Sequence, residues 1–302
     1  MKSYWRTNKI SNNKTKWKNL SKLQIEKEYN PSSIIGGNYS PYINKYIDDS
    51  LSSRNKYQSS IYYYGPRKSN IIEFAHLKNN PKSPLIVFIH GGYWQELSIK
   101  HSYFPAKGAI ENNFAYASID YTLAPNLSLS EIVSECCEAI KWISENSHYL
   151  GIDKEKIIIS GSSAGAHLAS MVILNKQIYS ANICGSILVS GIYEIEPLIN
   201  TSINDALNLN IDEANNNSPI LKSLKIFPPS LIVYGEIETL EFKRQSNSFI
   251  NKLLDFKCKT KFFEISNKNH FDVILDLTDN KKKLGKEVFK FLNLLEPINA
   301  KI

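Results

Sequence analysis

The sequence predicts an α/β protein with a mostly parallel central sheet and helices on both of its faces. Short apolar segments alternate with amphipathic ones along most of the chain, and the central apolar segments, such as residues 85–89, are uninterrupted. An uninterrupted apolar run is typical of a strand that is buried on both faces, as the strands of parallel sheets are. Of the 302 residues, 42% are hydrophobic and 22% are charged, a composition that supports a sizeable core.

The expected elements follow one another in the order that a parallel sheet needs. Strands are expected at residues 61–64, 71–75, 85–89, 114–119, 156–160, 187–190, 231–235 and 260–265. Helices are expected at residues 129–147, 164–174, 241–254 and 284–295, where apolar residues recur at helical spacing. Because connections through helices make neighbouring strands parallel, residues 58–302 are expected to form one domain.

Two segments stand apart from this alternation. Residues 1–57 are polar and mostly helical from residue 21 on, with breaks at Pro31 and Gly36, and are expected to form a helical extension that packs on the core. Residues 194–228 are rich in Asn and Ile and contain no clean strand. Because they follow a strand end, they are expected to form either a small cap over the active site or a plain long loop.

The chain is basic, with a formal net charge of +7 and a pI of about 9.0. Much of the excess lies near the N-terminus, where Glu26 is the acid among Lys2, Arg6, Lys9, Lys14, Lys16, Lys18, Lys22 and Lys27. Such a stretch fits an arm that binds nucleic acid or an anionic membrane, or a solvated surface. We favour the solvated surface and expect neither nucleic acid nor a membrane as a partner, because no nucleic-acid-binding fold accompanies the charge.

The remaining composition indicates a soluble, cytoplasmic protein. The first residues lack the continuous apolar region of a secretory signal, and no apolar run is long enough to span a bilayer. The cysteines are Cys136, Cys137, Cys184 and Cys258. They have no metal-ligand spacing and suggest no disulfide framework, so we expect free, buried thiols in a reducing compartment.

Residues 161–165, Gly-Ser-Ser-Ala-Gly, lie between an expected strand and an expected helix. They fit G-x-S-x-G, the nucleophile elbow, in which a sharp turn exposes a serine above the sheet at the positive end of a helix. Small residues are needed because the two arms of the turn approach closely. Ser163 is therefore the candidate nucleophile, and a Gly/Ser-rich turn without a catalytic role is the alternative.

Residues 90–94, His-Gly-Gly-Tyr-Trp, end the expected strand at residues 85–89. Acyl transfer needs N–H groups that point at the developing oxyanion, and glycines let such a loop approach the substrate. The expected donors are the N–H groups of Gly92, Tyr93 and Ala164, the residue after the nucleophile. His90 is then a brace for the loop, and a turn with a chance Gly-Gly pair is the alternative.

His270 is the candidate general base, because it follows the last expected strand, where a loop at the carboxyl edge of the sheet can reach Ser163. The order nucleophile, acid, histidine is that of the α/β-hydrolase fold, which we therefore predict. The acid should follow the strand at residues 231–235, where the chain offers Glu236, Glu238 and Glu241 and no Asp. We favour Glu238 as the residue that orients the imidazole and keep the other two as alternatives.

Together these motifs resemble the kynurenine formamidase-type α/β-hydrolases, relatives of the hormone-sensitive-lipase-like esterases, whose oxyanion loop is H-G-G-Y-W rather than H-G-G-G. The resemblance spans nearly the whole chain from Trp17 on. It includes a W…YNP stretch at 17–31, DYxLAP at 120–125, SGxYDLEPL from 190, EFxRQS at 241–246 and HFDV at 270–273. Glu238, where the family often has Asp, and Ser162, where many members have His, depart from the family pattern.

The resemblance implies a serine hydrolase without metal or cofactor that converts N-formylkynurenine to kynurenine and formate, a step of tryptophan degradation. Zinc-dependent enzymes of the same activity carry a His-rich motif that this sequence lacks. Many relatives instead hydrolyse small aryl or acyl esters, and some serve biosynthetic pathways, so a carboxylesterase or an acyl- or thioester-releasing enzyme is the alternative. A non-catalytic binding protein is disfavoured, because Ser163 and His270 are both present.

Aromatic side chains near the motifs are candidates for the substrate pocket. They are Trp94, Tyr121, His167 and Tyr193, together with Tyr93. Packing in the core is the alternative for each of them. The expected partner is a small-molecule aryl amide or ester. The oligomeric state is left open, with a homodimer as one alternative.

Overall fold

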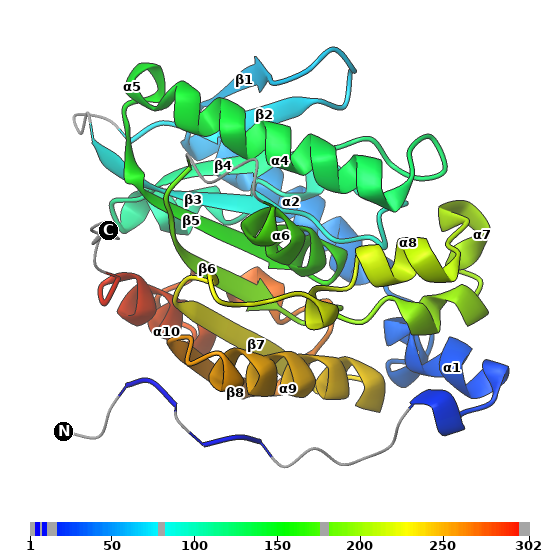
Figure 1. Cartoon of the computed structure of the whole chain (residues 1–302). Coiled ribbons are helices and arrows are strands. Elements are labelled where there is room, and N and C mark those ends of the chain that lie inside the picture. The colour runs from blue at the N-terminus through cyan, green and yellow to red at the C-terminus, as the bar shows by residue number, and fades with distance from the viewer. Residues whose placement is uncertain (1–3, 7, 11–16, 78–81, 176–180, 296–302) are drawn as a thin grey trace.

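The computed structural model describes residues 4–6, 8–10, 17–77, 82–175 and 181–295, and the remaining residues lie outside this description. The described chain forms one eight-stranded sheet in the order β1-β2-β4-β3-β5-β6-β7-β8 (Figure 1). The strands are β1 (Ser59–Tyr63), β2 (Ile71–Ala75), β3 (Ser83–Ile89), β4 (Ala115–Ile119), β5 (Ile152–Ser162), β6 (Ile183–Val189), β7 (Ser230–Ile237) and β8 (Thr260–Asn269). β2 pairs antiparallel with β1 and β4, and the other neighbours pair parallel, so the predicted mostly parallel sheet is confirmed.

Helices cover both faces of this sheet (Figure 1). The longer helices are α2 (Ser40–Lys56), α4 (Leu129–Glu145), α6 (Ala164–Leu174), α9 (Leu240–Asp255) and α10 (Lys283–Leu292). The shorter helices are α1 (Lys22–Glu28), α3 (Ala106–Glu111), α5 (Ser147–Leu150), α7 (Asn204–Leu207) and α8 (Ile211–Asn216). Residues of α4, α6 and α9 belong to one hydrophobic core, and residues of α2, α3 and α10 belong to a second.

The side chains of β3 alternate between the two cores. Leu85, Val87 and Ile89 lie in the first core, and Ile86 and Phe88 lie in the second. This is the period of two that a strand imposes on its side chains. Burial on both faces therefore explains why this segment of the sequence is apolar without interruption.

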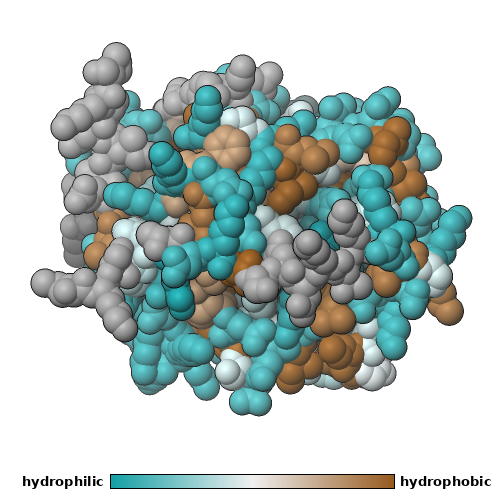
Figure 2. Space-filling view, turned by 60° about the horizontal axis from the view of Figure 1, so that its bottom comes forward, coloured by the Kyte–Doolittle hydropathy of each residue, from teal (hydrophilic) through white to brown (hydrophobic). Residues whose placement is uncertain are grey.

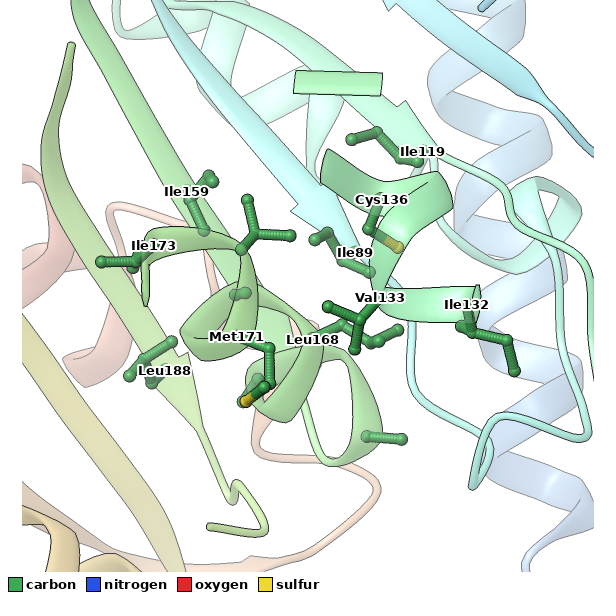
Figure 3. Packing of buried hydrophobic residues seen from close by; sticks show 14 of the residues in the cluster. Ile89, Ile119, Ile132, Val133, Cys136, Ile159, Leu168, Met171, Ile173 and Leu188 are labelled. Atoms are coloured by element: carbon green, nitrogen blue, oxygen red, sulfur yellow. The ribbon is translucent and has the colours of Figure 1, made fainter. Parts of the chain in front are cut away.

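The first core holds α6 on the sheet. Leu168 and Met171 of α6 pack with Val133 of α4 and Ile89 of β3 (Figure 3). α4 itself begins with a capping box, in which the Ser128 and Glu131 side chains each accept a hydrogen bond from the other residue's N–H group. Because the elbow immediately precedes α6, this packing also fixes the position of the turn that carries Ser163.

Some element boundaries differ from those predicted. The helix predicted at residues 129–147 is divided into α4 and α5 at Asn146, whose N–H group bonds back to Trp142 O. β8 is longer than predicted because its polar end still pairs with β7, as far as Asn269 opposite Ile237. Residues 194–228 hold α7, α8 and the 3₁₀ helices η5 (Glu196–Asn200) and η6 (Pro219–Leu221), which periodicity did not reveal because each is so short.

The N-terminal extension contributes to both cores. Trp17, Ile25 and Tyr29 belong to the first core, and Tyr46 of α2 belongs to the second. Trp17 Nε1 also donates a hydrogen bond of 3.0 Å to Glu194 Oε1. The extension is therefore joined to segments that lie far from it in the sequence.

Part of the basic N-terminal stretch is described by the structure. Lys2, Lys14 and Lys16 of the basic stretch lie outside the described residues, whereas Lys9 pairs with Asp255 at 2.6 Å. The face in Figure 2 shows hydrophilic residues around several separate hydrophobic patches.

In the described segments, no helix combines the length and the apolar character needed to cross a bilayer. The four cysteines are free, and Cys258 is half-buried where the other three are buried.

Candidate active site

Ser163 lies in a strained turn between β5 and α6. Its backbone has φ 57° and ψ −122°, in a region that residues other than glycine rarely adopt. Its N–H group donates to Val189 O of β6 at 2.9 Å, which fixes the turn to the neighbouring strand. The hydroxyl consequently stands at the N-terminus of α6, as the elbow motif predicts.

The two glycines of the motif are required by close approaches. A Cβ atom on Gly161 would lie 2.3 Å from Gly165 O, and one on Gly165 would lie 2.0 Å from Ile89 O of β3. Real Cβ atoms essentially never approach backbone oxygens this closely. The turn therefore packs against itself and against β3 in a way that excludes any side chain at either position.

The loop at residues 90–94 lies directly beside Ser163. A Cβ atom on Gly91 would be 3.2 Å from Ser163 Cβ. Gly92 and Tyr93 both have positive φ, 96° and 48°, and Gly92 O accepts the N–H groups of the two residues that follow Trp94. Among the described residues, no acceptor bonds the N–H groups of Gly92 or Tyr93, and Ala164 N, at the first position of α6, has no acceptor within the helix.

His90 braces this loop. Its ring stacks on Tyr121 with centroids 4.3 Å apart and an interplanar angle of 11°. His90 Nε2 lies 3.2 Å from Asp120 Oδ1, and the Tyr121 hydroxyl donates to His90 O at 3.0 Å. These contacts match the bracing role predicted for His90, and they give Tyr121 the same role.

The imidazole of His270 contacts one carboxylate. His270 Nδ1 lies 3.0 Å from Glu238 Oε2, and both side chains are buried. Of the two alternatives, Glu236 is exposed and accepts from Asn267 N, whereas Glu241 binds the Tyr29 hydroxyl and Arg244. Among the three glutamates that the sequence offered, only Glu238 reaches His270.

Ser163 and His270 line the same cavity. In the described chain no hydrogen bond joins the Ser163 hydroxyl to His270, although both side chains are only 6–7% exposed. Catalytic hydrogen bonds in proteins without bound substrate are often long or poorly aligned and shorten when the complex forms. The two residues therefore share a cavity, and the hydrogen bond between them that the sequence suggests stays a prediction.

The loop after His270 is held by the N-terminal extension. The ring of Phe271 stacks on Tyr39 and on Tyr42, with centroids 5.2 Å and 5.8 Å apart. The Tyr46 hydroxyl also donates to Phe271 O. These tyrosines follow one another along the start of α2, so the extension positions the histidine loop, a function that no sequence motif signalled.

The cavity has a volume of about 280 Å³, and several aromatic side chains line it. Besides the catalytic candidates, Gly92 and Tyr93, it is lined by Tyr39, Tyr46, Phe88, Phe104 and Phe271. Most of these residues come from the extension and from the histidine loop. No sequence pattern marked these residues, because their spacing resembles that of ordinary core residues.

Four residues predicted to line the substrate pocket do not line this cavity. Trp94, Tyr121, His167 and Tyr193 are at most 1% exposed and pack in the core. Trp94 meets the His167 ring edge-on with centroids 5.0 Å apart, and Tyr193 stacks on Phe249. These aromatic side chains therefore contribute to packing rather than to the cavity wall.

Burial gives His167 a pH-dependent effect on stability. Desolvation lowers the pKa of His167 to about 4 from an ordinary value of 6.5, so the folded protein holds it neutral while the unfolded chain protonates it. Between pH 6.5 and pH 4 the unfolded state therefore binds more protons, and we expect the free energy of unfolding to fall by about 3 kcal/mol as the pH is lowered across this window. Urea unfolding at pH 7 and pH 4.5 measures this effect.

His167→Gln is the matched control for this prediction, because an amide can still donate to Asn217 O, which lies 2.6 Å from His167 Nε2. Other groups titrate in the same range, so the difference in pH dependence between the two proteins isolates His167. An equal loss of stability in both proteins would contradict the assignment.

In the described part of the chain, no group of three or more His, Cys, Asp or Glu side chains is arranged to hold a metal ion. Two carboxylates, Glu26 and Glu96, line the cavity, and no Lys or Arg side chain is among its described lining residues. The wall is therefore aromatic and acidic, although the whole chain is basic.

Comparison with known proteins agrees with this architecture. The BD-FAE family model matches residues 74–187. A kynurenine formamidase from Danio rerio is 29% identical over 91% of this chain and 98% of its own length. The kynurenine formamidase from Salmo salar is 25% identical over 92% and 99% of the two lengths.

Solved structures show the same fold. A putative thioesterase from Silicibacter sp. tm1040 has a TM-score of 0.77 at 23% identity, over 88% of this chain and 99% of its own. EstE1, a thermophilic carboxylesterase from a metagenomic library, has a TM-score of 0.70 at 17% identity, over 87% and 99% of the two chains.

The likeness to hydrolases over nearly full length, joined to the elbow geometry, makes this chain a serine hydrolase of the α/β-hydrolase class. The predicted fold class is confirmed. Within this class the chain is similar to kynurenine formamidases, as the motifs in the sequence indicated.

Proposed function

We propose that this protein hydrolyses N-formyl aryl amides and that N-formylkynurenine, cleaved to kynurenine and formate, is its substrate. The observation that carries the proposal is the cavity that Ser163 and His270 share, in a chain whose full-length relatives are kynurenine formamidases. A formyl group is the smallest acyl group, so the aryl portion of the substrate supplies most of the contact area. The aromatic wall of the cavity suits that portion.

In the first half of the reaction, Ser163 Oγ attacks the formyl carbon and His270 Nε2 takes the hydroxyl proton. The N–H groups of Gly92, Tyr93 and Ala164 stabilise the negative oxygen of the tetrahedral intermediate. Glu238 accepts a hydrogen bond from the Nδ1–H group of His270, which orients the ring and stabilises the imidazolium. The carbon–nitrogen bond then breaks, and His270 gives its proton to the departing aniline nitrogen.

In the second half, His270 takes a proton from water as that water attacks the formyl-enzyme. The intermediate collapses to formate, and Ser163 recovers its proton from the imidazolium. The second half needs no residues beyond those of the first half, because an oxyanion develops at the same place in both.

The charges at the cavity also support this substrate. N-formylkynurenine carries an ammonium group and a carboxylate on its amino-acid portion, and Glu26 and Glu96 supply carboxylates at the wall that can pair with the ammonium group. Opposite charges attract a ligand to such a cleft and orient it there. An anionic aryl substrate without an ammonium group would lack this attraction.

A carboxylesterase acting on small aryl or acyl esters is the second candidate function, because the solved structures of the same fold include carboxylesterases such as EstE1. The same residues would serve an ester equally well, since the mechanism differs only in the leaving atom. The two functions therefore have to be separated by kinetics.

The experiment is a comparison of kcat/KM for N-formylkynurenine, formanilide, phenyl acetate and naphthyl acetate on the purified protein. We expect N-formylkynurenine to be the best substrate, by at least about tenfold in kcat/KM, which corresponds to about 1.4 kcal/mol of transition-state stabilisation. Formanilide, which lacks the amino-acid portion, is the matched control for the contribution of the charged groups. Better turnover of the two acetates would overturn the formamidase proposal in favour of the esterase.

A further inference from the structure

Ser190 occupies an unfavourable backbone conformation at the end of β6. Its φ is 52°, a value that glycine adopts readily and serine rarely does. Its side chain is fully buried, and its N–H group donates to Val233 O of β7 at 2.8 Å. Because a serine is present where a glycine would be less strained, its hydroxyl should have a function that offsets the strain.

That hydroxyl donates to the carboxylate that contacts His270. Ser190 Oγ lies 2.6 Å from Glu238 Oε1, and Gly235 N also donates to this oxygen at 2.6 Å. The second oxygen, Oε2, faces His270 Nδ1 at 3.0 Å. The two oxygens are thus distinguished: Oε1 is held by the ends of β6 and β7, and Oε2 is left for the imidazole.

The end of β6 also contacts the nucleophile. Val189, the residue before Ser190, accepts the Ser163 N–H group at 2.9 Å. Two successive residues of one strand end are therefore bonded to the nucleophile turn and to the carboxylate. This short segment connects the positions of Ser163 and Glu238.

We propose that Ser190 is a positioning residue, whose hydroxyl holds the Glu238 carboxylate in the orientation that His270 requires. The proposal rests on the proposed serine-hydrolase mechanism. Ser190 belongs neither to the nucleophile elbow nor to the oxyanion loop, so neither motif gives it a role. A glutamate has one more rotatable bond than an aspartate and reaches the imidazole from a longer side chain, so it needs an additional bond to keep one orientation. Charge-assisted hydrogen bonds from a buried hydroxyl are strong enough to supply it.

Ser190→Gly tests this role, because glycine removes the hydroxyl and at the same time relieves the positive φ. We expect kcat to fall by about 10- to 100-fold, the effect of losing a hydrogen bond to a charged group, with KM changed by less than about twofold. The variant should remain folded, as judged by its circular-dichroism spectrum and a cooperative thermal transition. A serine needed only for the structure of the turn would instead be replaced by glycine without loss of kcat.

Ser186→Ala is the matched control. Ser186 lies on the same strand, is fully buried, and shares a hydroxyl–hydroxyl bond of 2.8 Å with Ser230, far from the carboxylate. We expect this variant to lose thermal stability and to keep its kcat. A kcat loss equal to that of Ser190→Gly would show a general effect of buried serines and overturn the proposal.

A double variant tests whether Ser190 affects kcat through Glu238. In the Glu238→Gln background, Ser190→Gly should lower kcat by less than about twofold further, because the carboxylate that it positions is already gone. Independent, multiplying losses would contradict positioning through Glu238.

The rate of labelling by a fluorophosphonate probe separates this proposal from the choice of substrate. Labelling reports the reactivity of Ser163 whether the protein is a formamidase or an esterase. We expect Ser190→Gly to label at least about tenfold more slowly than the wild type. Labelling at the wild-type rate would overturn the role of Ser190, even if N-formylkynurenine proves to be the substrate.

Discussion

Ser163→Ala is expected to lower kcat/KM on every amide and ester substrate by at least about 10⁴-fold, because no other group can form the covalent intermediate. The alanine methyl group fits where the hydroxyl stood, so the fold should be kept. The residual rate, above that in water, would come from the oxyanion loop and from binding. Steady-state kinetics and loss of fluorophosphonate labelling measure the effect together.

Ser162→Ala is the matched control for this prediction. Ser162 precedes the nucleophile, is buried and lines the same cavity, but it is the last residue of β5 rather than the tip of the turn. We expect it to keep fluorophosphonate labelling. If Ser163→Ala still reacted with the probe while Ser162→Ala did not, the nucleophile would be assigned to the wrong serine.

Glu238→Gln is expected to lower kcat by about 10³- to 10⁴-fold through the tautomer of His270. Ser190 Oγ and Gly235 N both donate to Oε1, so the amide oxygen of glutamine must occupy that position. The amide NH₂ group would then face His270 Nδ1 and donate to it. The imidazole proton would then be on Nε2, and this nitrogen could no longer accept the proton of Ser163.

Glu236→Gln and Glu241→Gln complete this experiment. Glu236 is exposed, so its variant should keep wild-type kcat and stability. Glu241 accepts the Tyr29 hydroxyl at 2.8 Å and pairs with Arg244 in a buried site, so its variant should lose stability by more than it loses kcat. If Glu236→Gln or Glu241→Gln lost kcat as severely as Glu238→Gln does, the assignment of the acid would be wrong.

Local sequence patterns predicted the parts of the site that are built from residues adjacent in the chain. The elbow at Ser163 and the loop at Gly92 and Tyr93 are turns, and the glycines and small residues that such turns need are adjacent in the chain. His270 was found by its position after the last strand, because parallel strands end at the same edge of the sheet. These features need no knowledge of distant contacts.

The choice among three glutamates was less certain: the placement of the loop favoured Glu238, and Glu236 and Glu241 remained alternatives. Glu236, Glu238 and Glu241 lie within six residues of one another, and each fits the loop that should carry the acid. The outcome depends on Ser190 and Gly235, which come from two different strand ends and hold only Glu238 toward the imidazole. Sequence spacing contains no information on that convergence.

The substrate wall shows the same limit. Tyr121 and Tyr193 were predicted in the pocket and lie in the core, whereas Tyr39 and Phe271 line the cavity. An aromatic side chain suits a core and a pocket equally well, so its residue type does not distinguish them.

The sequence by itself determined the parallel sheet, the strained serine turn, the oxyanion loop and the histidine that follows the last strand, because each is specified by residues close together in the chain. Only the tertiary structure showed that Glu238, rather than Glu236 or Glu241, contacts that histidine, and which aromatic rings line the cavity. Both decisions depend on contacts between the N-terminal extension, the ends of β6 and β7, and the histidine loop, which lie far apart in the sequence and meet only when the chain is folded.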